Sequence, residues 1–347
     1  MVKVWQVVSV IVSALLIVAC AEKPLSSFDI AWRQYKARFY ENGRIVDTDN
    51  ADVSCAEGQG YGMLFAVAAD DQAQFSRLWT WSQTGLQRED RLFRRLSRPC
   101  LVKDRGCVYN RYSDTGGDIL IAWALLKAAH KWNKPDYQLE AMAIIHALSN
   151  HMVISRHGET LLLSGGPKGV FSNGDVQVNL SNWVFPALQA FAEATGDEIW
   201  DDIAVSGIAL IAQSESKWQL VPAWLRVSRQ GVSLNGVVSP EFDADAYRVP
   251  LYLAWQGVNV SLVAPFLRYW NEGRAPATWN LLSNEKAGYP MTADMLAVEA
   301  AVRTLYRVNG TRDAALTNTL VLRDDMDYVS ASLVMLSLLA VGEGIRQ

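Results

Sequence analysis

Long stretches of this sequence place apolar residues at helical spacing, and this pattern constrains the fold more than any other feature. Several are apolar nearly all round, as from Asp118 to Trp132, which is typical of helices buried among other helices. Two short runs, Thr160–Leu163 and Gly231–Leu234, are strand-like, and we expect them in hairpins near loops. The helical stretches are 28–41, 58–70, 72–86, 118–132, 137–151, 185–195, 199–213, 259–271, 293–308 and 326–341.

Many antiparallel helices in pairs suit either a closed helical toroid or an open solenoid. The sequence has no fixed-period repeat, which disfavours a solenoid. No low-complexity linker divides the chain after residue 27, and 347 residues suffice for one large core. We therefore predict an all-α fold, a closed α/α toroid with a few short strands in loops, that forms a single domain over residues 28–345.

The N-terminal segment is not expected to join this fold. Lys3 precedes an apolar run from Val7 to Ala19, which is too short to cross a bilayer and has the length of a signal-peptide core. Residues 17–20, Ile-Val-Ala-Cys, resemble a bacterial lipobox, which implies a signal peptide over 1–19, lipid attachment to Cys20 and a short tether over 20–27. Ala21 in place of an Asp favours the outer membrane by the same analogy. An ordinary cleaved signal with an incidental Cys is the alternative.

The cysteines, the histidines and the net charge further limit the kinds of site that the chain can form. Cys100 and Cys107 would close a short disulfide loop in an oxidising compartment, and Cys55 is then left over. The four His are scattered without a ligand spacing, so we predict no metal site, and no feature requires an organic cofactor. The net charge is −4 with no Lys/Arg block, so nothing supports a nucleic-acid partner.

Aromatic residues are the informative part of the composition, with thirteen Trp and twelve Tyr. Most Trp are expected in the core, but flat aromatic faces also hold sugar rings by their apolar sides. Hydrolysis of a glycosidic bond needs two carboxyl groups: a protonated one for the leaving oxygen and an ionised one to prepare a water. Three acidic segments are candidates for such a pair.

The first candidate is Glu57, which precedes Gly58, Gly60 and Gly62 at the start of a predicted helix. A carboxylate there also has a structural role, because it complements the helix dipole. Three Gly in the first turns lower the helix propensity. Bare backbone at this point is better explained if a substrate approaches closely.

The other two segments precede apolar helices. Asp118 follows Asp114 and a pair of Gly, and capping of the helix by Asp118 would explain its presence. Asp243 and Asp245 precede the apolar run Leu251 to Trp255. Arg248 stands three residues after Asp245 and can pair with it, either for structure or to keep it ionised for base chemistry.

Taken together, these segments resemble glycoside hydrolase family 8, most of all its bacterial members encoded with cellulose-synthesis machinery. The resemblance is collinear from about Trp32 to Leu339, and it implies an (α/α)6 barrel, in agreement with the helical pattern. The matching segments are Trp32–Phe39, Gly43–Asp47, Glu57–Met63, Asp118–Trp132, Asn179–Ser181, Leu220–Trp224, Asp245–Pro250 and Tyr328–Leu333.

The resemblance implies roles for individual residues. Glu57 matches the family's general acid, and Asp245 its general base with Arg248 as its neighbour. Enzymes of this family invert the configuration at the anomeric carbon. The resemblance therefore implies two carboxyl groups about 6.5–9.5 Å apart with a water between them. Glu57 must then be protonated at the working pH, which requires a desolvated setting that raises its pKa. The further residues expected to contact substrate are Tyr61, Asp114, Asp118, Trp183 and Trp224.

The chain also departs from the family's pattern. Two Asp separated by one small residue normally precede the central helix; here the first is Gly116 and only Asp118 remains. Asp114, two residues upstream, is a candidate substitute. The usual Tyr before the base is Ala244, and the usual Asp of a Pro-Asp-Trp segment is Ala223.

These observations predict an inverting endo-β-1,4-glucanase-like enzyme acting on cellulose or a related β-glucan. Its expected place is the periplasmic face of the envelope, lipid-anchored, where it would serve polysaccharide synthesis or export beside a synthase or export complex. Two alternatives stay open. One is a glycan-binding lipoprotein with weak or lost catalysis, motivated by Gly116. The other is a hydrolase of a different exopolysaccharide, for which Gly116 makes room for a substituted sugar.

Overall fold

The protein is described by a computed structural model that covers residues 26–98, 108–109, 112–165, 169–271, 275–307 and 319–344. The predicted signal peptide, the lipidation site Cys20 and the predicted Cys100–Cys107 disulfide lie outside the described residues. Cys55 lies within them and is a free thiol. None of the described helices is both long and apolar enough to cross a membrane.

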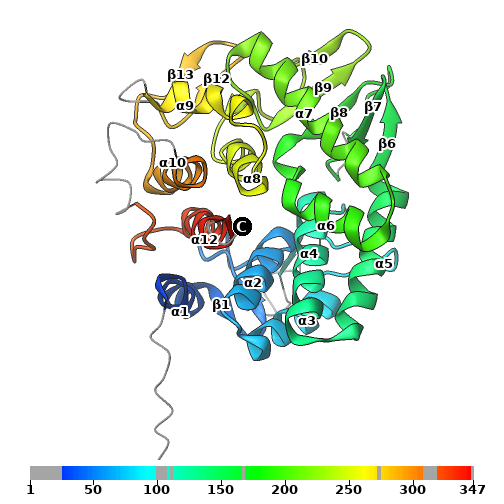
Figure 1. Ribbon diagram of the computed structural model, residues 1–347, viewed down its shortest axis with the longest axis vertical. Coiled ribbons are helices and arrows are strands. Elements are labelled where there is room, and N and C mark those ends of the chain that lie inside the picture. The colour runs from blue at the N-terminus through cyan, green and yellow to red at the C-terminus, as the bar shows by residue number, and fades with distance from the viewer. Residues whose placement is uncertain are drawn as a thin grey trace, which may run out of the picture.

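In the part of the chain that the structure describes, six helices form a closed inner ring (Figure 1). Each contacts the next along the chain, and α12 contacts α2, which closes the ring. The predicted (α/α)6 barrel is therefore confirmed. The inner helices are α2 (Ala56–Ala68), α4 (Thr115–Trp132), α6 (Phe185–Thr195), α8 (Arg248–Gln256), α10 (Ala293–Tyr306) and α12 (Tyr328–Gly344). The outer helices of the described part are α1 (Ser27–Phe39), α3 (Gln72–Gly85), α5 (Pro135–Met152), α7 (Ile199–Trp218) and α9 (Ala264–Asn271).

The two layers differ in how much of each helix is buried. In α2, 11 of 13 residues are buried, and in α4, 14 of 18. In the outer helices α1 and α7 the counts are 4 of 13 and 7 of 20. An inner helix is surrounded by other helices, whereas an outer one faces solvent on one side, so the apolar face of an outer helix is the narrower one.

The glycines at the start of α2 allow helices to approach one another and do not serve substrate access as predicted. A Cβ on Gly60 would lie 2.5 Å from Cβ of Leu120 in α4, and one on Gly62 would lie 2.6 Å from Cγ1 of Ile45. Gly58 likewise lies against α12. All three are buried. The prediction of bare backbone facing a substrate is wrong, because these positions face the core.

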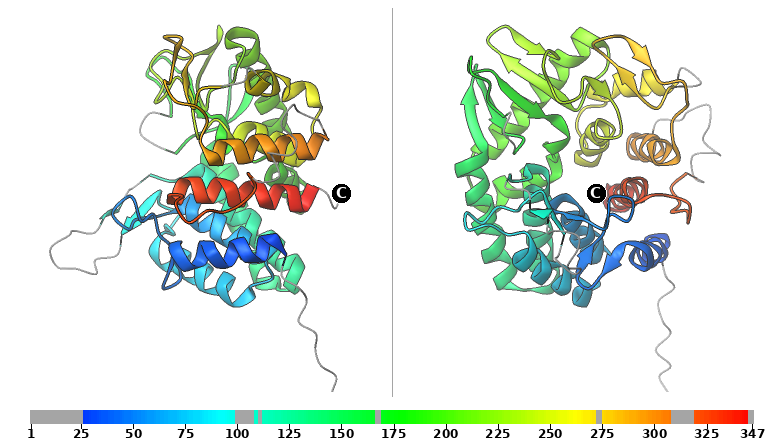
Figure 2. Two further views of the ribbon diagram at one scale, coloured as in Figure 1. Left: turned by 90° about the vertical axis from the view of Figure 1, so that its left-hand side faces the viewer. Right: turned by 180° about the vertical axis from the view of Figure 1, so that it is seen from behind.

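The strands are short, antiparallel and arranged around the barrel (Figure 2). The two predicted strand-like runs are confirmed as parts of the β6–β7 and β9–β10 hairpins. The strands are β1 (Tyr40–Glu41), β2 (Arg44–Ile45), β3 (Ser54–Cys55), β4 (Leu96–Arg98), β5 (Val108–Tyr109), β6 (Val153–Arg156), β7 (Glu159–Leu162), β8 (Val176–Asn179), β9 (Trp224–Ser228), β10 (Gly231–Ser233), β11 (Glu241–Phe242), β12 (Trp279–Asn280) and β13 (Glu285–Lys286).

Two local differences from the sequence expectation have physical reasons. The sequence pattern did not predict β8, because this strand pairs with β9, a partner far along the chain that gives no local signal. The short 3-10 helix η1 (Leu180–Asn182) follows β8. The predicted helix 259–271 is divided into η2 (Val260–Leu262) and α9, which has Pro265 near its start, where proline is tolerated.

Candidate active site

The predicted acid and base meet at one end of the barrel. Glu57 lies in the first turn of α2, and Arg248 begins α8, with Asp245 in the turn that precedes it. The N-terminal ends of α2, α4 and α8 gather there because the inner helices run parallel around the ring. The right-hand view of Figure 2 looks onto this end.

Arg248 joins the two carboxyl groups. Its Nη1 binds Oε1 of Glu57 and donates a hydrogen bond to the Tyr61 hydroxyl at 2.9 Å. Its Nη2 donates to Oδ1 of Asp245 at 2.6 Å. The side chains of Glu57 and Asp245 are 28% and 49% exposed, while that of Arg248 is 10% exposed. The acid candidate is thus the more desolvated of the pair, and the base candidate is the more open to water.

The surroundings of Glu57 favour its protonated form. Burial raises the pKa of Glu57 to about 7. The Arg248 guanidinium opposes that rise in pKa, whereas the negative charges of Asp114 and Asp245 add to it. The upward shift expected of a general acid is therefore present, and its main cause is desolvation.

Asp243 orients Asp245, the predicted base. Its Oδ1 accepts the backbone N–H groups of Asp245 and Ala246, at 3.1 and 3.2 Å. Burial, reinforced by the neighbouring charge of Asp245, raises the pKa of Asp243 to about 6. Sequence reasoning gave Asp243 no role of its own; its signal is the Asp-x-Asp spacing, in which the first side chain closes a turn around the second.

Gly116 lies at the centre of this site. A Cβ on Gly116 would point toward Glu57, 3.6 Å from its Oε1, and would lie 2.8 Å from Oδ1 of Asn182. The position at which the family resemblance led us to expect an Asp therefore lies beside Glu57. Asn182, which is 7% exposed, lies against that position. Sequence reasoning missed Asn182, although it directly follows the matching segment Asn179–Ser181.

Asp114 is brought close to Glu57. It occupies the N-cap position of α4. Burial raises the pKa of Asp114, and the Arg95 guanidinium and the backbone N–H groups of Gly117 and Glu57 oppose that rise. The Asp114 carboxylate thus lies close enough to interact with Glu57, as the substitution hypothesis requires.

Asp118 does not contact substrate as predicted. It is fully buried, and its carboxylate accepts the N–H of Phe93 at 2.7 Å and the hydroxyl of Ser113 at 3.0 Å. It is not the helix cap either, since α4 begins at Thr115. Asp118 instead fastens the segment before α4 to the loop around Phe93.

The three predicted aromatic contacts have different outcomes. Trp183 is fully buried, and its Nε1 donates to the Ile203 carbonyl at 2.8 Å, so the prediction that it faces the groove is wrong. Tyr61 is 5% exposed; it supports Arg248 and cannot offer its ring to a sugar. Trp224 is half-buried in β9 and keeps an accessible part.

Within the described ranges, no group of three or more His, Cys, Asp or Glu side chains is placed to hold a metal ion. The site instead contains groups that can donate and accept protons, and the Arg248 guanidinium contacts both Glu57 and Asp245. The Cys55 thiol, which accepts the N–H of Gly58 at 3.2 Å, caps α2 beneath it.

The structure is a closed barrel of paired helices with two carboxyl groups at one end of its inner ring, and a pair of carboxyl groups is what a glycoside hydrolase uses. The family described as glycosyl hydrolases family 8 matches residues 4–343. The chain belongs to this family.

Similar proteins and similar solved structures agree with this family assignment. The chain is 35% identical over 321 residues to a probable endoglucanase of Novacetimonas hansenii, covering 90% of both chains. It is 34% identical to an endoglucanase of Cellulomonas uda, covering 83% of this chain and 81% of that protein. The structure is similar to endo-beta-1,4-glucanase CMCax from Acetobacter xylinum, with a TM-score of 0.82, 31% identity and coverage of 92% and 99%. It is also similar to endoglucanase Cel10 from Klebsiella pneumoniae, with a TM-score of 0.80, 32% identity and coverage of 90% and 99%.

Proposed function

We propose that the protein is an inverting endo-β-1,4-glucanase with Glu57 as general acid and Asp245 as general base. The observation that carries this proposal is the single guanidinium of Arg248, which joins a desolvated carboxyl to an open carboxylate. The raised pKa of Glu57 fits the acid. The endoglucanase relatives support the substrate class.

The reaction follows from these positions. Glu57 gives its proton to the glycosidic oxygen as the bond between that oxygen and the anomeric carbon breaks. Asp245 takes a proton from a water, whose oxygen bonds to the anomeric carbon on the opposite face. Nη2 of Arg248 holds Oδ1 of Asp245 at 2.6 Å, which fixes the position of the carboxylate that receives this proton. Glu57 ends ionised and Asp245 protonated, and exchange with solvent restores both.

The place of the enzyme in the cell belongs to the same proposal. The lipobox-like residues before and at Cys20 support a lipoprotein on the periplasmic face, with the outer membrane favoured by Ala21. Such an anchor would hold the enzyme near a polysaccharide synthase or export complex. Replacement of Cys20 by Ser is expected to move the protein from the membrane fraction to the soluble periplasmic fraction. An unchanged membrane fraction would contradict lipid attachment at this residue.

Two other functions differ in what they need from the site. A glycan-binding lipoprotein is motivated by Gly116, but it has no need for the Glu57–Arg248–Asp245 arrangement. A hydrolase of another exopolysaccharide would use the same pair with a different sugar beside Gly116. Turnover separates the first alternative from the proposal, and a panel of soluble glycans separates the second.

The decisive experiment measures reducing-sugar release from barley β-glucan and from carboxymethylcellulose, using protein that lacks residues 1–20. Glu57→Gln is expected to lower kcat by about 10²- to 10⁴-fold, the usual contribution of a general acid. The matched control is Glu198→Gln, an exposed carboxylate between α6 and α7. Equal activity of wild type and Glu57→Gln would refute the acid assignment. Glucan retention without turnover in either protein would favour the binding function.

A further inference from the structure

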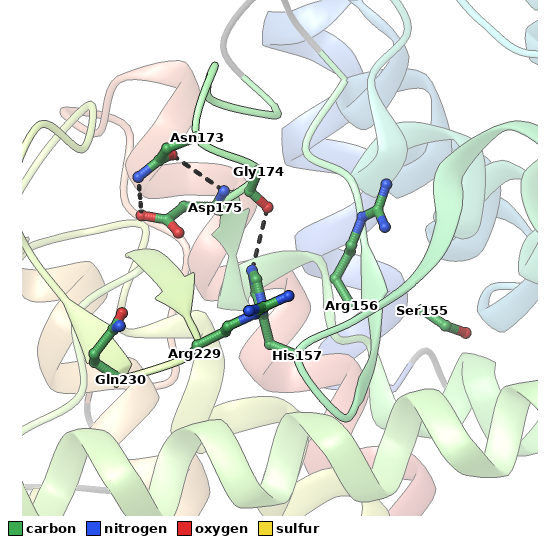
Figure 3. Close-up of a pocket in the computed structure, with 8 residues that line it drawn as sticks. All are labelled: Ser155, Arg156, His157, Asn173, Gly174, Asp175, Arg229 and Gln230. Atoms are coloured by element: carbon green, nitrogen blue, oxygen red, sulfur yellow. Dashed lines mark hydrogen bonds between the residues drawn. The ribbon is translucent and has the colours of Figure 1, made fainter.

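A polar pocket lies away from the catalytic pair (Figure 3). It has a volume of about 730 Å³ and is formed by the turn of the β6–β7 hairpin, the segment before β8 and the turn between β9 and β10. Every described residue that lines it is polar or glycine. The catalytic-site residues lie elsewhere, so this pocket is a separate feature of the surface.

The pocket carries an excess of positive charge. Arg156 and Arg229 are both exposed, and neither makes an ion pair within the described residues. Glu159 is the cross-strand neighbour of Arg156 in the β6–β7 ladder, but no ion pair joins these two described side chains. The acidic residue in the lining, Asp175, is already neutralised by Arg226, whose Nε donates to its Oδ2 at 2.8 Å. Two guanidinium groups therefore remain available to an anion.

The walls of the pocket are fixed by internal contacts. Asn173 donates its side-chain amide to Asp175 at 2.9 Å. The imidazole Nε2 of His157 lies 3.2 Å from the carbonyl oxygen of Gly174. Arg226 stacks on Phe171, with its guanidinium carbon 4.1 Å from the ring centroid. These contacts hold the groups around the two pocket arginines in place, which favours binding without much rearrangement.

A strand ladder connects this pocket to the catalytic end. The β8–β9 ladder has its outer pair at Val176 and Val227, directly beside the pocket, and its inner pair at Asn179 and Trp224. The three residue steps from Val176 to Asn179 span about 10 Å. η1 follows β8 at once and brings Asn182 against Gly116 and the acid. The pocket thus lies a short way along this ladder from Trp224, the half-buried residue at its inner end.

We infer that the pocket is a remote subsite for carboxylate substituents on a polysaccharide chain, held by Arg156 and Arg229. The inference rests on the proposed function, because the chain must reach the pocket from the catalytic end. A guanidinium binds a carboxylate through two parallel hydrogen bonds. The exposed amide of Gln230 suits sugar hydroxyls. A lipid surface fits the lining less well, since no apolar side chain among the described lining residues is there to insert.

The test compares a charged with a neutral soluble cellulose. In wild type, the ratio of kcat/KM for carboxymethylcellulose to kcat/KM for hydroxyethylcellulose is expected to fall as salt is raised. The double variant Arg156→Gln, Arg229→Gln is expected to lower this ratio by about fivefold, mainly through KM, since two exposed charge pairs contribute modestly. The matched control is Arg33→Gln, Arg77→Gln, two exposed arginines on α1 and α3. An unchanged ratio in the pocket variant, or an equal drop in the control, would overturn the inference.

Binding separates failure of this inference from failure of the proposed function. Retention of the Glu57→Gln protein on carboxymethylcellulose is measured with and without the pocket substitutions, and needs no turnover. Lost retention in the pocket variant supports the subsite even if the wild type is inactive. Equal retention refutes it even if the wild type is a glucanase. Binding to anionic phospholipid vesicles that depends on the two arginines, without an effect on the charged glucan, would assign the pocket to phosphate headgroups and overturn the polysaccharide assignment.

Discussion

Nη1 of Arg248 binds Oε1 of Glu57, and 191 positions of sequence separate the two residues. The same guanidinium also holds Asp245, three residues before it. A positive charge between two carboxyls lowers the cost of bringing them together, and it acts against the desolvation that raises the pKa of Glu57. The proposed acid and the proposed base are therefore linked through one side chain.

The pH dependence of catalysis follows from Glu57. Below its pKa of about 7 the acid is protonated, and above it the proton needed by the leaving oxygen is lost. We expect kcat/KM to fall as the pH rises through about 7, approaching tenfold per pH unit beyond it. Initial rates on barley β-glucan from about pH 5 to about pH 9, at constant ionic strength, measure this limb. A flat profile through this range would contradict the assignment.

The negative charge of Asp114 is expected to affect the pH at which kcat/KM falls. Because this negative charge raises the pKa of Glu57, Asp114→Asn is expected to move the alkaline limb to lower pH. Asp201→Asn, an exposed residue in the first turn of α7, is the matched control and should leave the profile in place. A limb that stays in place in Asp114→Asn would show that the two carboxyls do not interact.

The substitution hypothesis for Gly116 is tested by moving the carboxylate. Asp114→Ala is expected to lower kcat, and the double change Asp114→Ala, Gly116→Asp to recover part of the loss. Recovery is expected because a Cβ at position 116 points toward Glu57, with only the end of the Asn182 side chain in its way. Steady-state kinetics of the three proteins measure the effect. If the double variant is as slow as Asp114→Ala, a carboxylate at position 116 is not equivalent.

The stereochemical outcome tests the roles of the pair. A water activated by Asp245 attacks the face opposite the leaving oxygen, so the first-formed product should be the α-anomer from a β-linked glucan. Proton NMR of a cello-oligosaccharide digest, recorded before mutarotation, distinguishes the anomers. An initial β-anomer would mean retention and would make Asp245 a nucleophile.

The packing role of the α2 glycines predicts that the same substitution has opposite effects at two positions. Gly60→Ala is expected to destabilise the fold by about 1–3 kcal/mol, since its Cβ meets Leu120 of α4 at 2.5 Å. A Cβ at Gly342 in α12 would have no neighbouring atom within 4 Å. Gly342→Ala is therefore expected to stabilise the fold by about 0.5–1 kcal/mol. Urea denaturation measures both. A Gly60→Ala protein as stable as wild type would show that α2 and α4 can separate at no cost.

Much of the architecture is predictable from sequence, because the apolar pattern within each helix indicates how much of that helix is buried. A helix surrounded by others must be apolar on all sides, so the burial of α4 follows from its apolar pattern alone. The acid and base candidates follow from a family pattern. Sequence reasoning assigned the wrong roles to Gly60, Trp183 and Asp118, because a glycine, an aromatic ring or a carboxylate looks the same in sequence whether it faces a substrate or the core.

The pattern of residues along the chain is thus enough to specify the helices, their order and the two carboxyl residues that carry the proposed chemistry. The closed fold adds that Arg248 joins Glu57 to Asp245, that Asn182 lies against Gly116, and that a pocket with two arginines adjoins the same strand ladder. The physical reason is distance along the chain. Periodicity reports which face of a segment is buried, whereas contacts between residues far apart in sequence exist only once the ring of helices has closed.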